Sequence, residues 1–143
     1  MFIKQLTVFV ENKSGRLSAV MEAFGANGID ISALSLADTA DFGLLRMIVN
    51  KPYEALEVLH NQGIIAKITD VIAIAVDDTP GGLTGALAAL ANDGISIEYM
   101  YAFMGSSGKD ALVVIRADDN NKTLEACKKD GIKTGGADVA YKY

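Results

Sequence analysis

The sequence predicts an α+β fold in which one βαββαβ unit occurs twice along the 143 residues. The first observation behind this prediction is an internal repeat, in which Gly15-Arg16-Leu17 is matched by Gly81-Gly82-Leu83 66 positions later. The second is the hydrophobic period, which changes in the same order in both copies, from strand-like alternation to helical spacing and back. A repeat of this length indicates two small domains in tandem rather than a solenoid.

The repeat register extends well beyond the glycines. It pairs Glu11 with Asp77, Phe24 with Leu90, Gly28 with Gly94, and Ile31 with Ile97; at an offset of 68 it then pairs Leu44 with Leu112, Leu56 with Leu124, Gly63-Ile64 with Gly131-Ile132, and Asp70 with Asp138. The two added residues fall near Gly105-Ser106-Ser107-Gly108, a composition typical of a hairpin loop. An insertion confined to a turn indicates that the repeat is structural.

Each copy opens with a strand and a helix. Leu6, Val8 and Val10 alternate with less apolar residues, as Ile72, Ile74 and Val76 do in the second copy. Apolar residues then recur at helical spacing from Leu17 to Phe24, and Gly28 follows as a helix stop. The elements expected next are strands at 29–37 and 43–49, a helix at 52–61 opened by proline, and a strand at 68–72.

This order is that of the ferredoxin-like fold, with antiparallel sheets that carry their helices on one face. We place the first domain at residues 1–68 and the second at 69–143. No linker rich in Gly, Pro or Ser separates them, and residues 65–76 are continuous in strand character. One long strand is therefore expected to end the first unit and begin the second.

The loop that joins the first strand to the first helix carries a short motif in both copies. It spans residues 11–17 (ENKSGRL) and 77–83 (DDTPGGL). This loop resembles the signature of the ACT domain, a family of small regulatory domains, in which an acidic or amide residue, Pro-Gly or its equivalent, and a leucine open the first helix. Ser14 departs from the pattern where the second copy has Pro80. The layout is similar to that of stand-alone tandem ACT proteins, and the resemblance implies binding of a free amino acid at this loop and the adjoining interface.

The chemistry of the loop supports a carboxylate site there. Glycine lets a ligand approach the backbone, and the free N–H groups of a first helical turn attract a carboxylate. The predicted ligand-binding residues are Asn12, Lys13, Ser14, Gly15, Arg16, Leu17, Asp78, Thr79, Pro80, Gly81, Gly82 and Leu83. The alternative is that Asn12, Asp78 and Thr79 are simply helix caps and the glycines simply turn residues.

The two loops differ in charge. The first offers Lys13 and Arg16, whereas the second offers Asp77 and Asp78 and has Gly82 at the position of Arg16. We expect the first loop to be the better carboxylate acceptor, and Asp77 or Asp78 to hold an α-ammonium group if the loops share a ligand. The alternative is that these charges are solvated rim residues.

Several strands are apolar on both faces, including residues 44–49 and 112–115. Tyr99, Tyr101 and Phe103 add an aromatic stripe. A sheet covered by helices on one face is expected to be polar on the other unless something covers it. We therefore predict that the open faces pack against another sheet, within the chain or across a homodimer. The alternative is that the stripe lines a ligand pocket.

Composition excludes several functions. The net charge of −5, without a basic cluster, argues against nucleic acid and anionic membranes as partners, and no apolar run is long enough to span a bilayer. We expect a soluble, cytoplasmic protein without a cofactor. Cys127, the single cysteine, is expected to be a buried apolar residue, and residues 118–121 a turn and helix cap rather than a calcium site. Gly135-Gly136 is expected to be a loop before the last strand.

We therefore expect a non-enzymatic regulatory protein that binds a free amino acid, forms a homodimer through sheet faces or edges, and acts on an enzyme of amino-acid metabolism. One alternative is an interaction subunit whose loops bind nothing and whose role is oligomerisation with an enzyme. A small enzyme of this fold is disfavoured, because no base and nucleophile pair can be assembled around His60, the single histidine.

Overall fold

The computed structural model describes residues 2–39, 41–104 and 110–135. The chain folds as two compact units. The first unit is Lys4–Thr69, and the second is the chain from Asp70 onward together with the first three residues. The predicted turn at 105–108 and residues 136–143, which include the end of the predicted second domain, lie outside the described residues.

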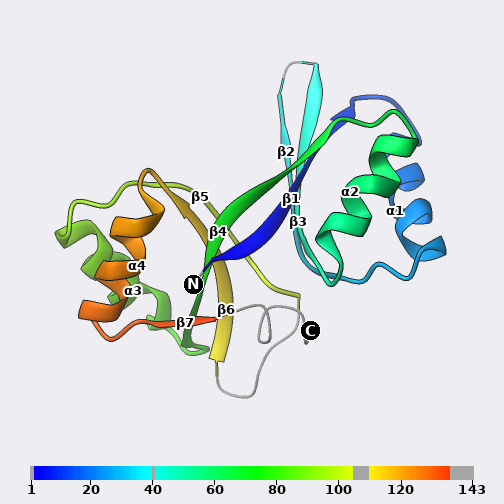
Figure 1. The fold of residues 1–143 in the computed structure, drawn as a ribbon. Coiled ribbons are helices and arrows are strands. Elements are labelled where there is room, and N and C mark those ends of the chain that lie inside the picture. Colours follow the sequence, from blue (N-terminus) through cyan, green and yellow to red (C-terminus); the bar gives the residue numbers. More distant parts are fainter. Residues whose placement is uncertain (1, 40, 105–109, 136–143) are drawn as a thin grey trace. The chain divides into compact units, whose positions relative to one another are not determined.

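Each unit has the predicted order of elements (Figure 1). The first contains β1 (Ile3–Glu11), α1 (Arg16–Ala26), β2 (Ile31–Asp38), β3 (Phe42–Val49), α2 (Pro52–Asn61) and the start of β4 (Ala66–Asp77). The second continues with α3 (Gly82–Asn92), β5 (Ile97–Ala102), β6 (Asp110–Ala117), α4 (Asn120–Lys129) and β7 (Lys133–Gly135). The prediction of a ferredoxin-like βαββαβ unit repeated twice is confirmed, and β4 is the long strand that both units use.

In the first unit β3 lies between β2 and β1, and both pairings are antiparallel. Val8 of β1 stands opposite Leu45 of β3, and the N–H of Phe9 donates to the carbonyl oxygen of Ile65 at 2.9 Å. Helices α1 and α2 lie on one face of this sheet (Figure 1). Their buried side chains, among them Phe24 and Leu59, pack with those of β1 and β3 into one apolar core.

The second unit repeats this plan in the order β7-β4-β6-β5, again antiparallel. Helices α3 and α4 supply Leu90 and Cys127 to the core, where they meet Ile72 and Ile115 of the sheet. One expectation was wrong: Gly135 is not in a loop but is buried in β7, paired with Ala73 of β4. A strand of three residues at the edge of a sheet is too short to leave an alternating pattern in the sequence.

Side chains on the sheet faces away from the helices are also buried. Ile48 and Val114 are fully buried, and Ala73 is 1% exposed. Parts of these faces are therefore buried, as the apolar strands indicated, although Phe42 at the start of β3 is 42% exposed. The packing of another sheet over them stays a prediction. Among the described helices, none is long and apolar enough to cross a membrane.

Candidate functional site

Both β–α loops end on a glycine at the N-cap position of the helix. Gly15 precedes α1 with φ of 85°, and Gly81 precedes α3 with φ of 81°. This left-handed conformation is one that residues with a Cβ adopt only at a cost. No side chain caps either helix; the N–H groups of Arg16 and Gly82 donate to the backbone carbonyl oxygens of Lys13 and Thr79, and the next N–H groups, of Leu17 and Leu83, are open to another acceptor.

The loops differ at the next residue. A Cβ added to Gly82 would lie 1.9 Å from the carbonyl oxygen of Asp77, whereas Arg16 occupies the matching position of the first loop with a full side chain. The first helical turns also differ in their hydrogen bonds. In α1 the N–H of Ala19 donates to the carbonyl oxygen of Gly15, four residues back, whereas in α3 the N–H of Thr84 donates to the carbonyl oxygen of Gly81, three residues back. The second loop is closed too tightly to carry an arginine at this position.

Asn12 is not a helix cap. Its side-chain amide donates to Asp38 Oδ1 at 3.2 Å and to the carbonyl oxygen of Thr39 at 3.3 Å, which ties the loop to the end of β2. The helix-cap alternative is therefore wrong for this residue, because the helix begins three residues later than a cap at Asn12 would require. The donor atoms of Asn12 are already used within the unit.

Four of the predicted residues line one hollow beside this loop, which we call the loop pocket. It has a volume of about 310 Å³. Its lining residues include Asn12, Lys13, Ser14 and Leu17, together with Leu36 of β2 and the buried Gly43 of β3. Lys13 Nζ forms an exposed ion pair with Glu11 Oε2 at 3.2 Å.

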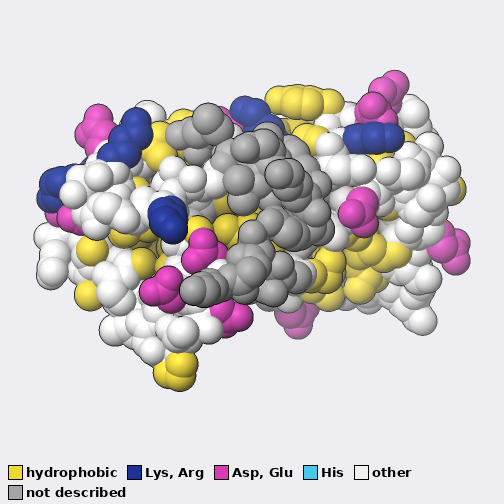
Figure 2. All heavy atoms as spheres, turned by 90° about the horizontal axis from the view of Figure 1, so that it is seen from below, with side chains coloured by type: hydrophobic (Ala, Val, Ile, Leu, Met, Phe, Trp, Pro, Cys, Tyr) yellow, Lys and Arg dark blue, Asp and Glu magenta, His cyan; other side chains and the backbone are white. Residues whose placement is uncertain are grey.

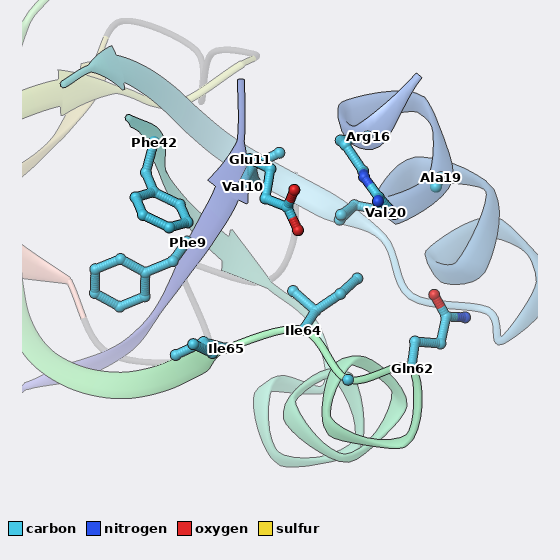
Figure 3. Close-up of a pocket in the computed structure, with 11 residues that line it drawn as sticks. Phe9, Val10, Glu11, Arg16, Ala19, Val20, Phe42, Gln62, Ile64 and Ile65 are labelled. Carbon is cyan, nitrogen blue, oxygen red and sulfur yellow. The ribbon is translucent and has the colours of Figure 1, made fainter. Parts of the chain in front are cut away.

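A second hollow of about 320 Å³ lies on the other side of the start of α1, and we call it the Glu11–Arg16 cavity (Figure 3). Glu11 projects from the end of β1 and Arg16 from the start of α1, and both side chains point into the space above Ile64. Apolar side chains, including Phe42 and Val20, form much of the remaining wall. The cavity therefore combines one carboxylate and one guanidinium with a mixed lining of apolar side chains and the polar Gln62.

Within the part of the chain that the structure describes, Arg16 has no ion-pair partner. A guanidinium presents five N–H donors in a planar fork that fits a carboxylate. Arg16 is thus the cation of the first loop with all of its side-chain donors available, whereas Lys13 already makes one exposed contact with Glu11.

The second unit has a matching cavity of about 280 Å³, built from equivalent positions. Gly82 stands where the first unit has Arg16, Asp77 matches Glu11, Asp110 matches Phe42, and Asp130 matches Gln62. Three carboxylates and Lys133 therefore line this cavity. Hydrogen bonding with Asp93 raises the pKa of Asp130. The two pseudo-equivalent cavities differ in charge, and the second disfavours a carboxylate ligand.

The remaining residues predicted in the second loop are divided between surface and core. Asp78, Thr79, Pro80 and Gly81 are exposed, while Leu83 packs against the core of the second unit. Gly82 is the member of this set that lines the matching cavity.

Sequence reasoning missed the far wall of the Glu11–Arg16 cavity, namely Phe42, Gln62 and Ile64. A signal for part of it existed, because Gly63-Ile64 repeats as Gly131-Ile132, at the bend between the second helix and the last strand of each unit. The repeat register paired Glu11 with Asp77, but it did not predict that Glu11 lines the cavity.

Other chemically distinctive residues have structural roles. Cys127 is fully buried, and desolvation raises the pKa of its thiol. His60 lies in the last turn of α2, with Nε2 3.2 Å from the carbonyl oxygen of Ala66. No cluster of three or more potential metal ligands occurs among residues 2–39, 41–104 and 110–135.

Together, the repeated fold and its paired glycine-capped loops define a tandem of small ferredoxin-like domains. The chain belongs to the ACT domain pair family, whose model matches residues 1–133. The resemblance of its loops to the ACT signature is thereby confirmed. No curated protein matches the chain at a significant level.

Solved structures resemble the chain over all or most of its length. Protein BT0572 from Bacteroides thetaiotaomicron is 40% identical, with a TM-score of 0.93 over 100% of this chain and 98% of that one. The ligand-free regulatory subunit of aspartate kinase from Thermus thermophilus is 19% identical, with a TM-score of 0.64 over 89% and 91% of the two chains. The corresponding subunit from Thermus flavus is 18% identical, with a TM-score of 0.59 over 92% and 94%. At these identities the two kinase subunits show the fold alone.

Proposed function

We propose that this chain is a non-enzymatic regulatory protein that binds a free amino acid at the β1–α1 loop of its first unit. The observation that carries the proposal is the first loop itself, in an ACT domain pair: it borders two hollows of about 310 and 320 Å³, and its helix start is uncapped by any side chain. An uncapped helix start and nearby cations are suited to a carboxylate.

The second loop supports a different role. Asp78 and Thr79 replace the amide Asn12 and the cation Lys13 of the first loop, and Gly82, at the position of Arg16, cannot carry a side chain. Like charges would repel the carboxylate of an amino acid there. We therefore propose one amino-acid site per chain, in the first unit.

An enzyme of amino-acid metabolism is the proposed partner. The similar chain from Thermus thermophilus is a regulatory subunit of aspartate kinase, and this chain also consists of an ACT domain pair. Figure 2 shows one face of the molecule, on which the described Lys and Arg side chains are scattered among Asp and Glu rather than gathered. This distribution suits a protein partner better than nucleic acid.

A second candidate role, oligomerisation without a ligand, is favoured by apolar exposure on the edge strand β2. Leu34 is 37% exposed and Leu36 is 55% exposed. Exposed apolar side chains on a strand with a free edge favour pairing with another chain. This role predicts a homodimer whose formation is indifferent to amino acids.

Thermal unfolding of the purified chain against each common L-amino acid tests the proposal. A ligand at 100 times its dissociation constant should stabilise the folded state by about 2.7 kcal/mol. We expect a selective, saturable rise in Tm with one amino acid or a small related group, and no rise with the D-enantiomer.

The loop variant Asn12→Ala should weaken this response, because it removes the two hydrogen bonds that hold the loop to the end of β2. Asn121→Ala on the exposed surface of α4 is the matched control and should respond as the wild type does. A flat panel at millimolar concentrations would contradict amino-acid binding and favour the oligomerisation role.

A further inference from the structure

We infer that the Glu11–Arg16 cavity of the first unit, rather than the loop pocket, holds the ligand, and that the ligand is an amino acid with a small apolar side chain. In this arrangement Arg16 binds the α-carboxylate and Glu11 binds the α-ammonium group. The inference rests on the proposed function and assigns it a site and a ligand class.

The charges of the cavity match those of a zwitterion. The cavity has one carboxylate and one guanidinium on facing elements, β1 and α1, and their side chains enter the same space (Figure 3). Arg16 has no ion-pair partner within the described residues, and a carboxylate accepts a planar guanidinium in a bidentate pair. A zwitterion presents both complementary charges about one carbon atom and so matches both walls.

Glu11 can accept a second cation. Its Oε2 already pairs with Lys13 at 3.2 Å, in an exposed contact. A carboxylate offers about four acceptor positions on two oxygens, so this pair leaves room for an ammonium group as well. An exposed ion pair holds its partners weakly, so Glu11 can turn toward a ligand at little cost.

The rest of the cavity wall carries no charge. Val20 is 1% exposed and Phe42 is 42% exposed, and Ile64 lies half-buried below the two charges. Beyond the two charged residues, the polar side chain of this lining is that of Gln62. A ligand with a charged side chain would find no counter-charge in this wall, whereas an aliphatic side chain would bury apolar surface.

The two cavities of the chain differ at the residues that would contact the ligand. The matching cavity of the second unit has a glycine in place of Arg16 and aspartates in place of Phe42 and Gln62. It lacks the arginine and the Phe42 side of the wall, keeps apolar residues such as Val76 and Ile132, and adds Lys133 among three carboxylates. Arg16 and Phe42, which would contact the ligand, are therefore positions at which the first cavity differs from the matching cavity of the second unit.

Isothermal titration of the full chain with defined probes tests the inference. L-Valine and L-leucine are compared with isobutylamine, which lacks the carboxylate, with N-acetyl-L-valine, which lacks the ammonium group, and with L-aspartate and L-lysine. We expect saturable binding of valine or leucine and at least tenfold weaker binding of the other four probes.

Charge variants follow with the aliphatic probe that binds. Arg16→Gln and Glu11→Gln should each raise the Kd roughly 10- to 100-fold, as expected for the loss of a hydrogen-bonded charge contact. Their matched controls, Lys67→Gln and Glu22→Gln, change the same charges at exposed sites outside the cavity and should leave the Kd within about twofold.

Filling variants identify the hollow without changing charge. Ala19 lines the Glu11–Arg16 cavity on the exposed side of α1, so Ala19→Phe should abolish binding, while Ser18→Phe one residue earlier should not. Loss of binding in Ser14→Phe, with binding retained in Ala19→Phe, would place the amino acid in the loop pocket and overturn the inference while the proposed function stands. Tighter binding of aspartate or lysine would overturn the ligand class, and no binding of any amino acid would overturn both.

Discussion

Gly82 is the residue at which the two loops differ most. Replacement by alanine would place a Cβ 1.9 Å from the carbonyl oxygen of Asp77, so the loop must open for the side chain to fit. We expect Gly82→Ala to lower the free energy of unfolding by about 1–3 kcal/mol, the usual cost of forcing an extra carbon into a packed site.

Gly85 in the same helix provides the control for this prediction. A Cβ added there meets nothing within 4 Å, so Gly85→Ala should raise the free energy of unfolding by about 0.5–1 kcal/mol through helix propensity. Urea unfolding of both variants measures the difference. Equal effects of the two substitutions would show that the second loop is not closed as described.

At the scale of elements, the ends of α3 and α4 meet in a group of three charges. Lys129 Nζ lies 2.6 Å from Asp93 Oδ1. Hydrogen bonding to Lys129 lowers the pKa of Asp93, while hydrogen bonding with Asp93 raises the pKa of Asp130 above 3.8. The two helix ends are therefore held by a charge pair with a second carboxyl beside it.

The raised pKa of Asp130 makes a prediction about pH. A carboxyl whose folded pKa is raised contributes stability that is full below its unfolded pKa and is lost as pH rises through the folded pKa. The Asp130→Asn variant has no carboxyl at this position, so it does not lose this stability as the pH rises. We expect the variant to have a higher urea midpoint than the wild type at pH 7, and the gain to vanish as pH falls below 3.8.

Asp41→Asn, at an exposed position of the first unit, controls for the change in net charge. A gain in Asp130→Asn that grows toward low pH, or an equal gain in both variants at pH 7, would contradict the assignment of the carboxyl pair.

Some elements were predictable because their cause is local. The helix at 52–61 has the predicted bounds, because Pro52 at its first position is a start signal that depends on no distant contact. The helix cap at residues 118–121 was also predictable. The side chain of Asp119 accepts from the N–H of Lys122 at 3.0 Å, and these two residues are close neighbours in the sequence.

Others depend on contacts that no local pattern carries. The position of Asn12 is set by Asp38 and Thr39, 26 and 27 residues away, and Gly135 is a strand residue because β4 is there to pair with it. Local sequence patterns therefore do not reveal the structural roles of such residues.

At the scale of the whole molecule, the internal repeat was sufficient to predict both units and the strand that they share. It predicted the candidate site less completely. The repeat located the loops, but the hollow beside Arg16 is completed by Phe42, Gln62 and Ile64, which come from two further segments, the start of β3 and the connection between α2 and β4. Walls assembled from separate segments become visible only when the chain is folded.

The repeat also shows what has diverged. The two units keep the same core positions, while the cavities beside α1 and α3 differ in charge and in the residue after the cap glycine. This difference in charge at the two cavities, against a shared core, suggests different roles for the two units. We therefore expect a single amino-acid site in the 15.1 kDa chain.

Mapping of backbone amide shifts by NMR, during titration of the full chain with the amino acid selected by thermal unfolding, tests this central claim most directly. The account predicts saturable shifts concentrated at Glu11–Ala19 and at residues 62–65, with the matching amides of the second unit, residues 77–85 and 130–133, unchanged. Equal shifts in both units, or shifts confined to the second, would contradict it.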